Sequence, residues 1–263
     1  MEKRFHMLRP EQIIEQRDKC PVAYIPLGTL EWHGLHNPIG ADGLQAEELA
    51  LRCANQGGVV FPTVYYGESR VNSLLETDPK YQAGICERLS LNKNQFDADR
   101  FPYSGIAQIE HYQHHLIHII SEAASYGFDL VVFVIGHYPL IESARSAIIL
   151  YNQWAYDKEW KRITGLAAAD YLLLKDEYTS PGDHAGGWET SHLLASHPET
   201  VNLKAAANEL QYGIMSTRNP LHATAQFGNE IYDAAVKKIT EHVFLCLNNP
   251  KPYMGCLLYT SPS

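Results

Sequence analysis

The stretch LVVFVIGHYP (130–139) decides the fold, because it combines a strand with an immediate turn. Its first six residues are all apolar and show no polar alternation, which is typical of a strand buried on both faces of a parallel sheet. Working outward, similar apolar runs occupy 22–27, 59–66 and 163–174, and helical patterns occupy 44–54, 107–125, 140–154, a segment starting at 189, and 229–246. This alternation of strands and helices predicts a three-layer α/β/α domain with a mostly parallel central sheet.

The domain prediction is a single unit over residues 1–255, with an insertion at about 70–104. In the insertion, Asn, Asp and Pro turn signals surround a short helical segment and break the rhythm of strands and helices. We expect this segment to cover the functional site. The last eight residues, CLLYTSPS (256–263), resemble translated adapter sequence and are predicted to be a non-native tail.

Composition excludes several classes of partner. The net charge is −9 and the pI about 5.8, whereas nucleic-acid binding needs a concentrated surplus of Lys and Arg. No apolar run reaches the roughly 18 residues of a membrane span, and the first residues lack the apolar core of a signal peptide. The five cysteines are scattered without CxxC spacing, so neither a disulfide framework nor a thiolate zinc site is indicated. We predict a cytoplasmic protein that binds neither nucleic acid nor membrane.

The loop after the first predicted strand, GTLEWHGLHNPIGADG (28–43), is rich in metal-ligating side chains. Glu31 and His33 are two residues apart, so in extended backbone they project to the same side, and Asp42 can return a carboxylate to the same place. Imidazole and carboxylate groups suit zinc, manganese and similar divalent ions. The alternative for this loop is that Asp42 only caps a helix and that His33 and His36 are solvated.

Two further loops carry polar groups. His137 follows the 130–136 strand directly, with Gly136 permitting a sharp turn, and TSPGDHAGGWETS (179–191) supplies Asp183, His184 and Glu189. In open parallel sheets, functional groups gather at the carboxyl ends of strands. Three such loops together favour a metal centre over three unrelated surface loops.

With these residues assembled, the chain resembles the creatininase (creatinine amidohydrolase) family from about residue 20 to 245. Four motifs carry the resemblance: GTLEWHGLHNPIGADGLQAEELA (28–50), IGHYPL (135–140), HAGGWETS (184–191) and NPLHATAQFGNEIYDAAV (219–236). The resemblance implies that Glu31 and His137 hold one metal ion, His33 holds a second, and Asp42 bridges the two. The implied cofactors are two divalent ions, zinc and/or manganese, with iron or cobalt as alternatives.

The resemblance also implies residues on the substrate side. His184 matches a histidine that handles protons during ring opening, and Glu189 matches a glutamate at the metal centre, where we expect it to serve as both ligand and catalytic residue. Ser69, Tyr138 and Trp188 match or adjoin substrate-binding positions. Tyr138 packing beside a strand end, Ser69 in a turn and Trp188 in the core are the structural alternatives.

Two departures from the family pattern bear on the substrate. Members that hydrolyse creatinine have Asn and Glu where this chain has Ile135 and Pro139, so one carboxylate ligand is missing and Glu189 is its candidate replacement. Creatinine is therefore not the expected substrate. The leading hypothesis is hydrolytic opening of a small polar cyclic substrate at an amide or lactam C–N bond.

Two alternatives to that hypothesis stay open. One is hydrolytic C–C cleavage of a cyclic polyol ketone such as a keto-inositol (inosose). The other is a non-catalytic metal-binding or regulatory subunit. The resemblance further implies a homo-oligomer, a hexamer or another closed ring.

Overall fold

The computed structural model describes residues 1–67, 79–92, 102–207 and 213–250. In this part of the chain, four parallel strands form one sheet in the order β2 (Val59–Val60), β1 (Val22–Leu27), β3 (Leu130–Ile135) and β4 (Thr164–Ala168). β1 and β3 pair along their whole length, from Val22 opposite Leu130 to Leu27 opposite Ile135. The two most apolar runs of the sequence therefore form the centre of the sheet.

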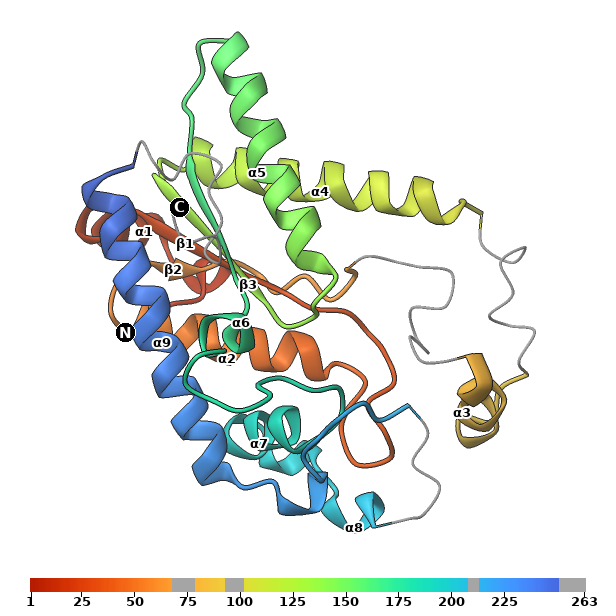
Figure 1. Cartoon of the computed structure of the whole chain (residues 1–263). Coiled ribbons are helices and arrows are strands. Elements are labelled where there is room, and N and C mark those ends of the chain that lie inside the picture. The colour runs from red at the N-terminus through yellow and green to blue at the C-terminus, as the bar shows by residue number, and fades with distance from the viewer. Residues whose placement is uncertain (68–78, 93–101, 208–212, 251–263) are drawn as a thin grey trace.

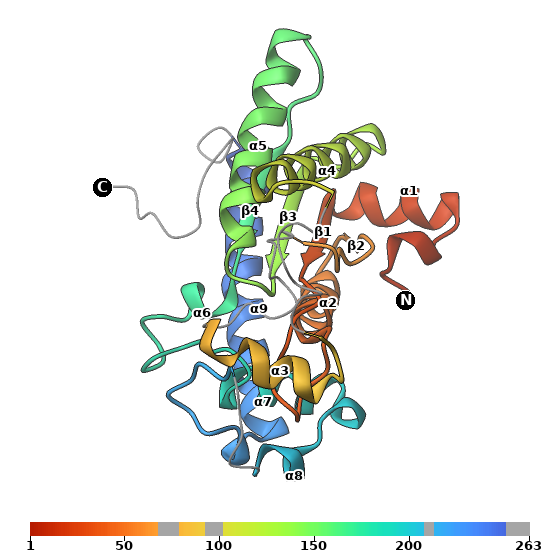
Figure 2. The same cartoon turned by 90° about the vertical axis from the view of Figure 1, so that its right-hand side faces the viewer.

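Helices cover both faces of this sheet, as the α/β/α prediction requires (Figure 1). One layer consists of α4 (Gly105–Ser125) and α5 (Leu140–Asp157), and the other of α2 (Ala41–Ala54), α7 (Gly187–Ser196) and α9 (Ala225–Asn248). The remaining helices are α1 (Pro10–Lys19), α3 (Gln82–Arg88), α6 (Asp170–Leu173) and α8 (Leu203–Ala206). Of these, α1 lies beyond the β2 edge of the sheet (Figure 2).

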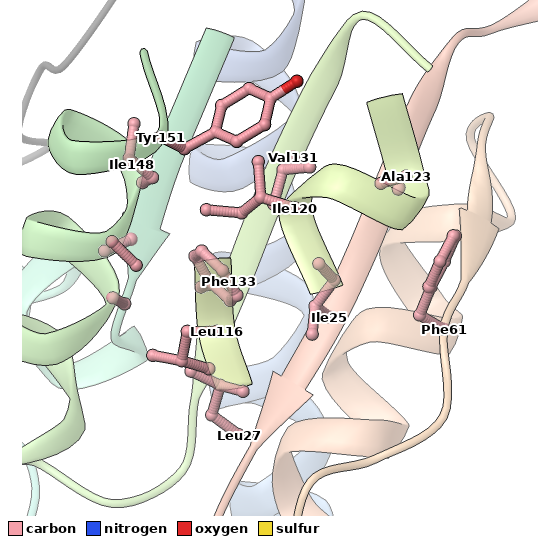
Figure 3. Close-up of a cluster of buried hydrophobic side chains, with 14 of the residues drawn as sticks. Ile25, Leu27, Phe61, Leu116, Ile120, Ala123, Val131, Phe133, Ile148 and Tyr151 are labelled. Atoms are coloured by element: carbon pink, nitrogen blue, oxygen red, sulfur yellow. The ribbon is translucent and has the colours of Figure 1, made fainter. Parts of the chain in front are cut away.

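The alternating direction of the side chains along each strand divides the hydrophobic core into two clusters. Ile25, Leu27, Val131 and Phe133 face α4 and α5, where Leu116 and Ile120 of α4 and Ile148 and Tyr151 of α5 meet them (Figure 3). The intervening residues of each strand, such as Tyr24 and Val132, face α2 and α9. Since successive side chains of a strand point to opposite faces, a run that is apolar throughout can serve both layers.

Two predicted strands are shorter than expected. The 59–66 run forms only the two residues of β2, because Pro62 has no N–H to donate to a ladder, and Val64 returns to the sheet through a single bridge to Leu27. The 163–174 run ends as a strand at Ala168, and its second half turns into α6. The 179–191 loop therefore starts several residues beyond a strand end.

The insertion is described only over 79–92 and 102–104, and it contains the predicted short helix, α3. Ile85 and Cys86 of this helix pack against Trp32, which lies between Glu31 and His33. The described part of the insertion thus covers the loop that follows β1. Ser69 and the 256–263 tail lie outside the described residues. None of the described helices combines the length and apolarity needed to cross a bilayer.

Candidate metal centre

Two adjacent strands and one helix deliver the candidate ligands. Glu31 and His33 lie on the loop after β1, Asp42 lies in the first turn of α2, and His137 follows β3. Because β1 and β3 are parallel neighbours, their carboxyl ends meet at the same edge of the sheet. All four side chains are at most 7% exposed, so the structure buries them together.

Glycines allow α2 to reach this edge. A Cβ on Gly136 would lie 2.0 Å from the carbonyl oxygen of Asp42, and one on Gly28 would lie 2.3 Å from the backbone nitrogen of Gly43. The chain bends at Gly136 and turns directly after it, as predicted, although Gly136 does not have a positive φ. What requires glycine there is the close passage of the helix that carries Asp42.

The ligand atoms form three groups, of which one consists of Glu31, His33 and His184 and the other two share Asp42. In the first of the two that share Asp42, His137 Nδ1 lies 3.0 Å from Glu31 Oε1 and 3.3 Å from Asp42 Oδ2. In the second, His33 Nε2 lies 3.0 Å from Asp42 Oδ1 and 3.4 Å from Glu189 Oε2. This grouping is consistent with the family resemblance, which implies Glu31 and His137 at one ion, His33 at the other and Asp42 between them, and these roles stay predictions.

These separations fit divalent ions. Ligand bonds of roughly 2.0–2.2 Å place neighbouring ligand atoms about 3.0 to 3.5 Å apart in octahedral or tetrahedral geometry. Glu31 Oε1, His33 Nε2 and both carboxylate oxygens of Asp42 are buried without a hydrogen bond of acceptable geometry among the described residues. His33 donates its other ring N–H, at Nδ1, to the Glu31 carbonyl oxygen at 3.2 Å, which is how metal-binding histidines are commonly held.

The pKa values of the clustered groups show that the site lacks positive charge when no metal ion is bound. Burial lowers the pKa of His33, but the carboxylates of Asp42 and Glu189 outweigh burial and raise it to about 10. Burial raises the pKa of Glu31 and of Glu189 to about 8. Without a cation, the site therefore keeps protons on its imidazole and glutamates. Divalent ions would replace these protons, since metal ligands bind in their deprotonated forms.

His184 lies against the same cluster, beside Glu31 and His33. Its Nδ1 lies 3.5 Å from Glu31 Oε1, and its Nε2–H donates to the Trp32 carbonyl oxygen at 2.8 Å. Burial, followed by the charge of His33, lowers the pKa of His184 to about 4. The imidazole is thus neutral at neutral pH, with the Nδ1 lone pair directed toward the ligands.

The loop before α7 fixes Glu189. Asp183 accepts hydrogen bonds from the backbone N–H groups of Trp188 (2.8 Å) and Glu189 (3.1 Å) and from the Ser216 hydroxyl (2.8 Å), so it caps the helix that carries Glu189. The N–H of Ala185 donates to Glu189 Oε2 at 2.8 Å. Ala185 holds φ at 56°, a left-handed conformation that costs a non-glycine residue about 1 kcal/mol or more. This strain lies directly beside the cluster.

Sequence reasoning missed a second layer of buried polar residues. Gln45 Nε2 donates to Glu189 Oε1 at 3.2 Å and lies 3.4 Å from the Gly136 carbonyl oxygen, and Gln45 Oε1 accepts from His192 Nδ1 at 3.1 Å. A carbonyl only accepts, so Gly136 fixes which end of the amide faces Glu189. The available signal was spacing: Gln45 and His192 each lie three residues after a candidate ligand on a helix, and therefore share its face.

His36 is buried, as is His33, so the alternative that both histidines of this loop are solvated is wrong. Its Nε2–H donates to the Ala185 carbonyl oxygen at 2.9 Å, so its ring supports the strained loop and lies outside the ligand groups. Between His33 and His36 the chain turns at Gly34, where φ is 73°.

A cavity of about 400 Å³ adjoins the cluster, with Gln45 and Glu189 in its wall. Tyr138 lines it and is 62% exposed, which suits a substrate contact. Trp188 also lines it, but it is 1% exposed, and its indole N–H donates to Asp170 at 2.8 Å. Trp188 is therefore mainly a core residue that forms one wall.

Comparison with known proteins now decides the family. The model of the family described as creatininase, creatinine amidohydrolase, matches residues 6–243. The chain belongs to the creatininase family. No curated protein is significantly similar to this creatininase-family chain in sequence.

Solved creatininase structures share its fold. A creatinine amidohydrolase (creatininase) crystal structure is 20% identical, with a TM-score of 0.69 over 95% of this chain and 98% of that one. A structure named Creatininase Mn is 19% identical, with a TM-score of 0.67 over 92% and 98% of the two chains. A mutant creatininase of Zn-Zn type gives the same identity and TM-score over 92% and 97%.

Family membership and the clustered ligands together confirm the predicted enzyme class, a divalent-metal-dependent hydrolase. The individual roles of Glu31, His33, Asp42, His137, His184 and Glu189 stay predictions, which the geometry makes specific.

Proposed function

We propose that this creatininase-family chain opens a small, polar, cyclic substrate by hydrolysis of an amide or lactam C–N bond. The observation that carries the proposal is the position of the ligand cluster beside a cavity of about 400 Å³, with Glu189 in both. This volume suits a single substituted ring and lies near the lower end of typical small-molecule sites. Zinc or manganese are the proposed ions, held by Glu31, Asp42 and His137 in one position and by His33, Asp42 and Glu189 in the other.

When bound, the two ions supply a nucleophilic water near neutral pH and polarise the substrate carbonyl. His184 is the proposed proton carrier. Its Nδ1 lone pair faces the cluster and takes up a proton, which it then delivers to the departing nitrogen. The hydrogen bond from Nε2–H to Trp32 holds the ring in the orientation that this transfer needs. Tyr138, and Ser69 outside the described residues, are proposed to contact the substrate.

The departures at Ile135 and Pro139 argue against creatinine as the substrate. Ile135 is the last residue of β3 and only 4% exposed, and Pro139 begins the turn into α5, so neither supplies a ligand atom. Glu189 Oε2, at 3.4 Å from His33 Nε2, supports its assignment as the replacement ligand. A site with a changed ligand set is expected to accept a different ring.

A second candidate is hydrolytic C–C cleavage of a cyclic polyol ketone such as a keto-inositol. The observation that favours it is that the cavity wall includes the Asp170 carboxylate and the Tyr138 hydroxyl, which offer partners for ring hydroxyls. In this reaction His184 would protonate the departing carbon instead of nitrogen.

Assays with panels of substrates distinguish the two proposed reactions from each other and from the non-catalytic alternative. Purified protein loaded with zinc or manganese is incubated with lactams and cyclic amides, including creatinine, and with keto-inositols, and ring opening is followed by mass spectrometry as the gain of one water. We expect turnover in the first panel, with creatinine a poor substrate. Turnover confined to keto-inositols would support the second candidate. Tight binding of two ions without turnover in either panel would support the non-catalytic alternative.

Assembly and location complete the proposal. We propose a closed homo-oligomer, with a hexamer as the expected form, in the cytoplasm. Light scattering of the metal-loaded protein measures the oligomeric state, and a monomer at micromolar concentration would contradict the proposed homo-oligomer.

A further inference from the structure

Outside the metal centre, α4 carries an exposed row of metal-ligating side chains. Four of the chain's 13 histidines fall within eight residues of this helix: His111, His114, His115 and His118. We call them the α4 histidine face. All four are exposed, and they take no part in the network around Glu189. Figure 1 shows α4 reaching beyond the sheet, away from α2 and α7.

Helical geometry puts these imidazoles on one side. At about 100° per residue, positions i, i+3, i+4 and i+7 fall within roughly a third of the helix circumference. The buried residues of α4, among them Tyr112, Leu116 and Ile120, occupy the opposite side, against α5 and the sheet. Packing therefore holds the helix in one rotation, and that rotation presents the histidines to solvent.

The spacing provides pairs of ligands one turn apart. His111 precedes His115 and His114 precedes His118 by four residues, the spacing at which two histidines on one helical face bind zinc. The next position along the second row is Glu122, whose Oε1 lies 3.4 Å from His118 Nε2. That separation is about the edge of a tetrahedron around an ion with bonds of roughly 2.0–2.1 Å.

Charge on the helix favours a cation. The segment from Gly105 to Ser125 contains no lysine or arginine, and its two charged residues, Glu110 and Glu122, are each four residues from a histidine of the row. His111 packs edge-on against Tyr103, at 4.6 Å between ring centres, which leaves His114 and His118 as the more available pair.

We propose that the α4 histidine face is a second, surface metal site, separate from the catalytic cluster, which binds a divalent ion such as Zn²⁺, Ni²⁺ or Cu²⁺. His114 and His118 are the protein ligands, and Glu122 and water complete the coordination. Nitrogen-rich sites of this kind favour the later first-row ions over Mg²⁺ or Ca²⁺.

The test measures nickel uptake by protein whose catalytic centre is already filled with zinc. Equilibrium dialysis against Ni²⁺, followed by elemental analysis of both metals, should show nickel bound in addition to the zinc. A His114→Ala/His118→Ala variant should lose the additional nickel while its zinc content and hydrolytic activity stay unchanged. The matched control, His6→Ala/His222→Ala, removes two exposed histidines that lie outside α4 and should bind nickel like the wild type.

Three outcomes would overturn the proposal. Wild-type protein could take up nickel only in exchange for zinc, the α4 variant could bind as much nickel as the wild type, or the control variant could lose nickel to the same extent. The first would assign the nickel to the catalytic cluster, the second to other residues, and the third to surface histidines in general.

Discussion

The two faces of the central sheet bury different kinds of side chain. On one face, α4 and α5 contribute only Gln108 and Ser143 to the buried polar residues of the described chain. On the other, α2 and α7 contribute Asp42, Gln45, Glu189, Thr190, Ser191 and His192. The same strands serve both faces, since each strand presents alternate residues to each layer.

This difference separates what stabilises the molecule from what makes it reactive. The α4–α5 face gains stability from apolar burial, which needs no partner groups. The α2–α7 face contains carboxylates and imidazoles, which are costly to bury unless a cation or hydrogen bonds compensate them. Changes on the first face should therefore alter folding, and changes on the second should alter metal binding and turnover.

The largest effect is expected for Asp42→Ala, because Asp42 belongs to both of the ligand groups proposed to hold the two ions. We expect loss of both ions and a fall of activity to background, measured by elemental analysis and the ring-opening assay. Glu48→Ala, on the same helix but in a surface ion pair with Arg52, is the control and should keep both. Equal activity in wild type and Asp42→Ala would indicate that the cluster is not catalytic.

Truncation of a core side chain on the α4–α5 face should lower stability and leave metal binding unchanged. Phe133→Ala removes a fully buried ring between α4 and α5 and should lower the free energy of unfolding by about 3–5 kcal/mol. Urea denaturation measures the loss. The fraction that stays folded should bind the same number of ions as the wild type, and metal loss from fully folded protein would break the separation of the two faces.

Replacing the proposed proton carrier tests chemistry without removing a ligand. His184→Gln should lower kcat by about 10²–10⁴-fold, as expected for a lost general acid–base group, with the metal content unchanged. His184 Nδ1 also faces Glu31, which is a proposed metal ligand. The metal content of the variant therefore distinguishes a proton carrier from a metal ligand. Loss of one ion in this variant would make His184 a ligand instead.

A smaller effect is expected from the buried amide that supports Glu189. Gln45→Ala removes its hydrogen bond to Glu189 Oε1 and should weaken binding of the ion on that side about 10–100-fold, with the other ion retained. Competition with a chelator measures the two affinities. Gln226→Ala, an exposed glutamine, is the control. Equal weakening of both ions would show that Gln45 supports the helix packing and not Glu189 alone.

The smallest effect concerns pH and metal removal. In metal-free protein the pKa of Glu31 and of Glu189 is raised by burial to about 8, from an unfolded value near 4.5. The folded state then binds more protons than the unfolded state, so this stability is present below about pH 4.5 and is lost as pH rises to about 8.

Differential scanning fluorimetry checks this sign. The Tm of chelated protein should fall between about pH 6.5 and 8, by roughly 2–4 °C for each kcal/mol lost, because the opposite effect of His184, whose pKa is lowered to about 4, is complete below that range. Metal-loaded protein should not show this fall, since the ions hold both carboxylates ionised. A Tm of chelated protein that rises over this interval would contradict the protonation of the empty cluster.

Much of this architecture could be predicted from local pattern. The 130–135 strand, the helices on both sides of the sheet and the polar loops after β1 and β3 follow from periodicity and from the position of Gly136 and His137. The errors arose where a local signal was ambiguous. Pro62 ended a strand that composition favoured, and the 163–174 run turned into a helix after Ala168.

The sequence by itself determined where apolar residues recur with the period of a strand or of a helix, and which loops carry imidazole and carboxylate groups. Only the tertiary structure decided that Gly136 is needed for the passage of α2, and that Gln45 and His192 support Glu189. The physical reason is the separation along the chain of the residues that interact. Periodicity is set by neighbours a few residues apart, whereas these contacts join segments about 90 to 150 residues apart and depend on how whole helices pack against the sheet.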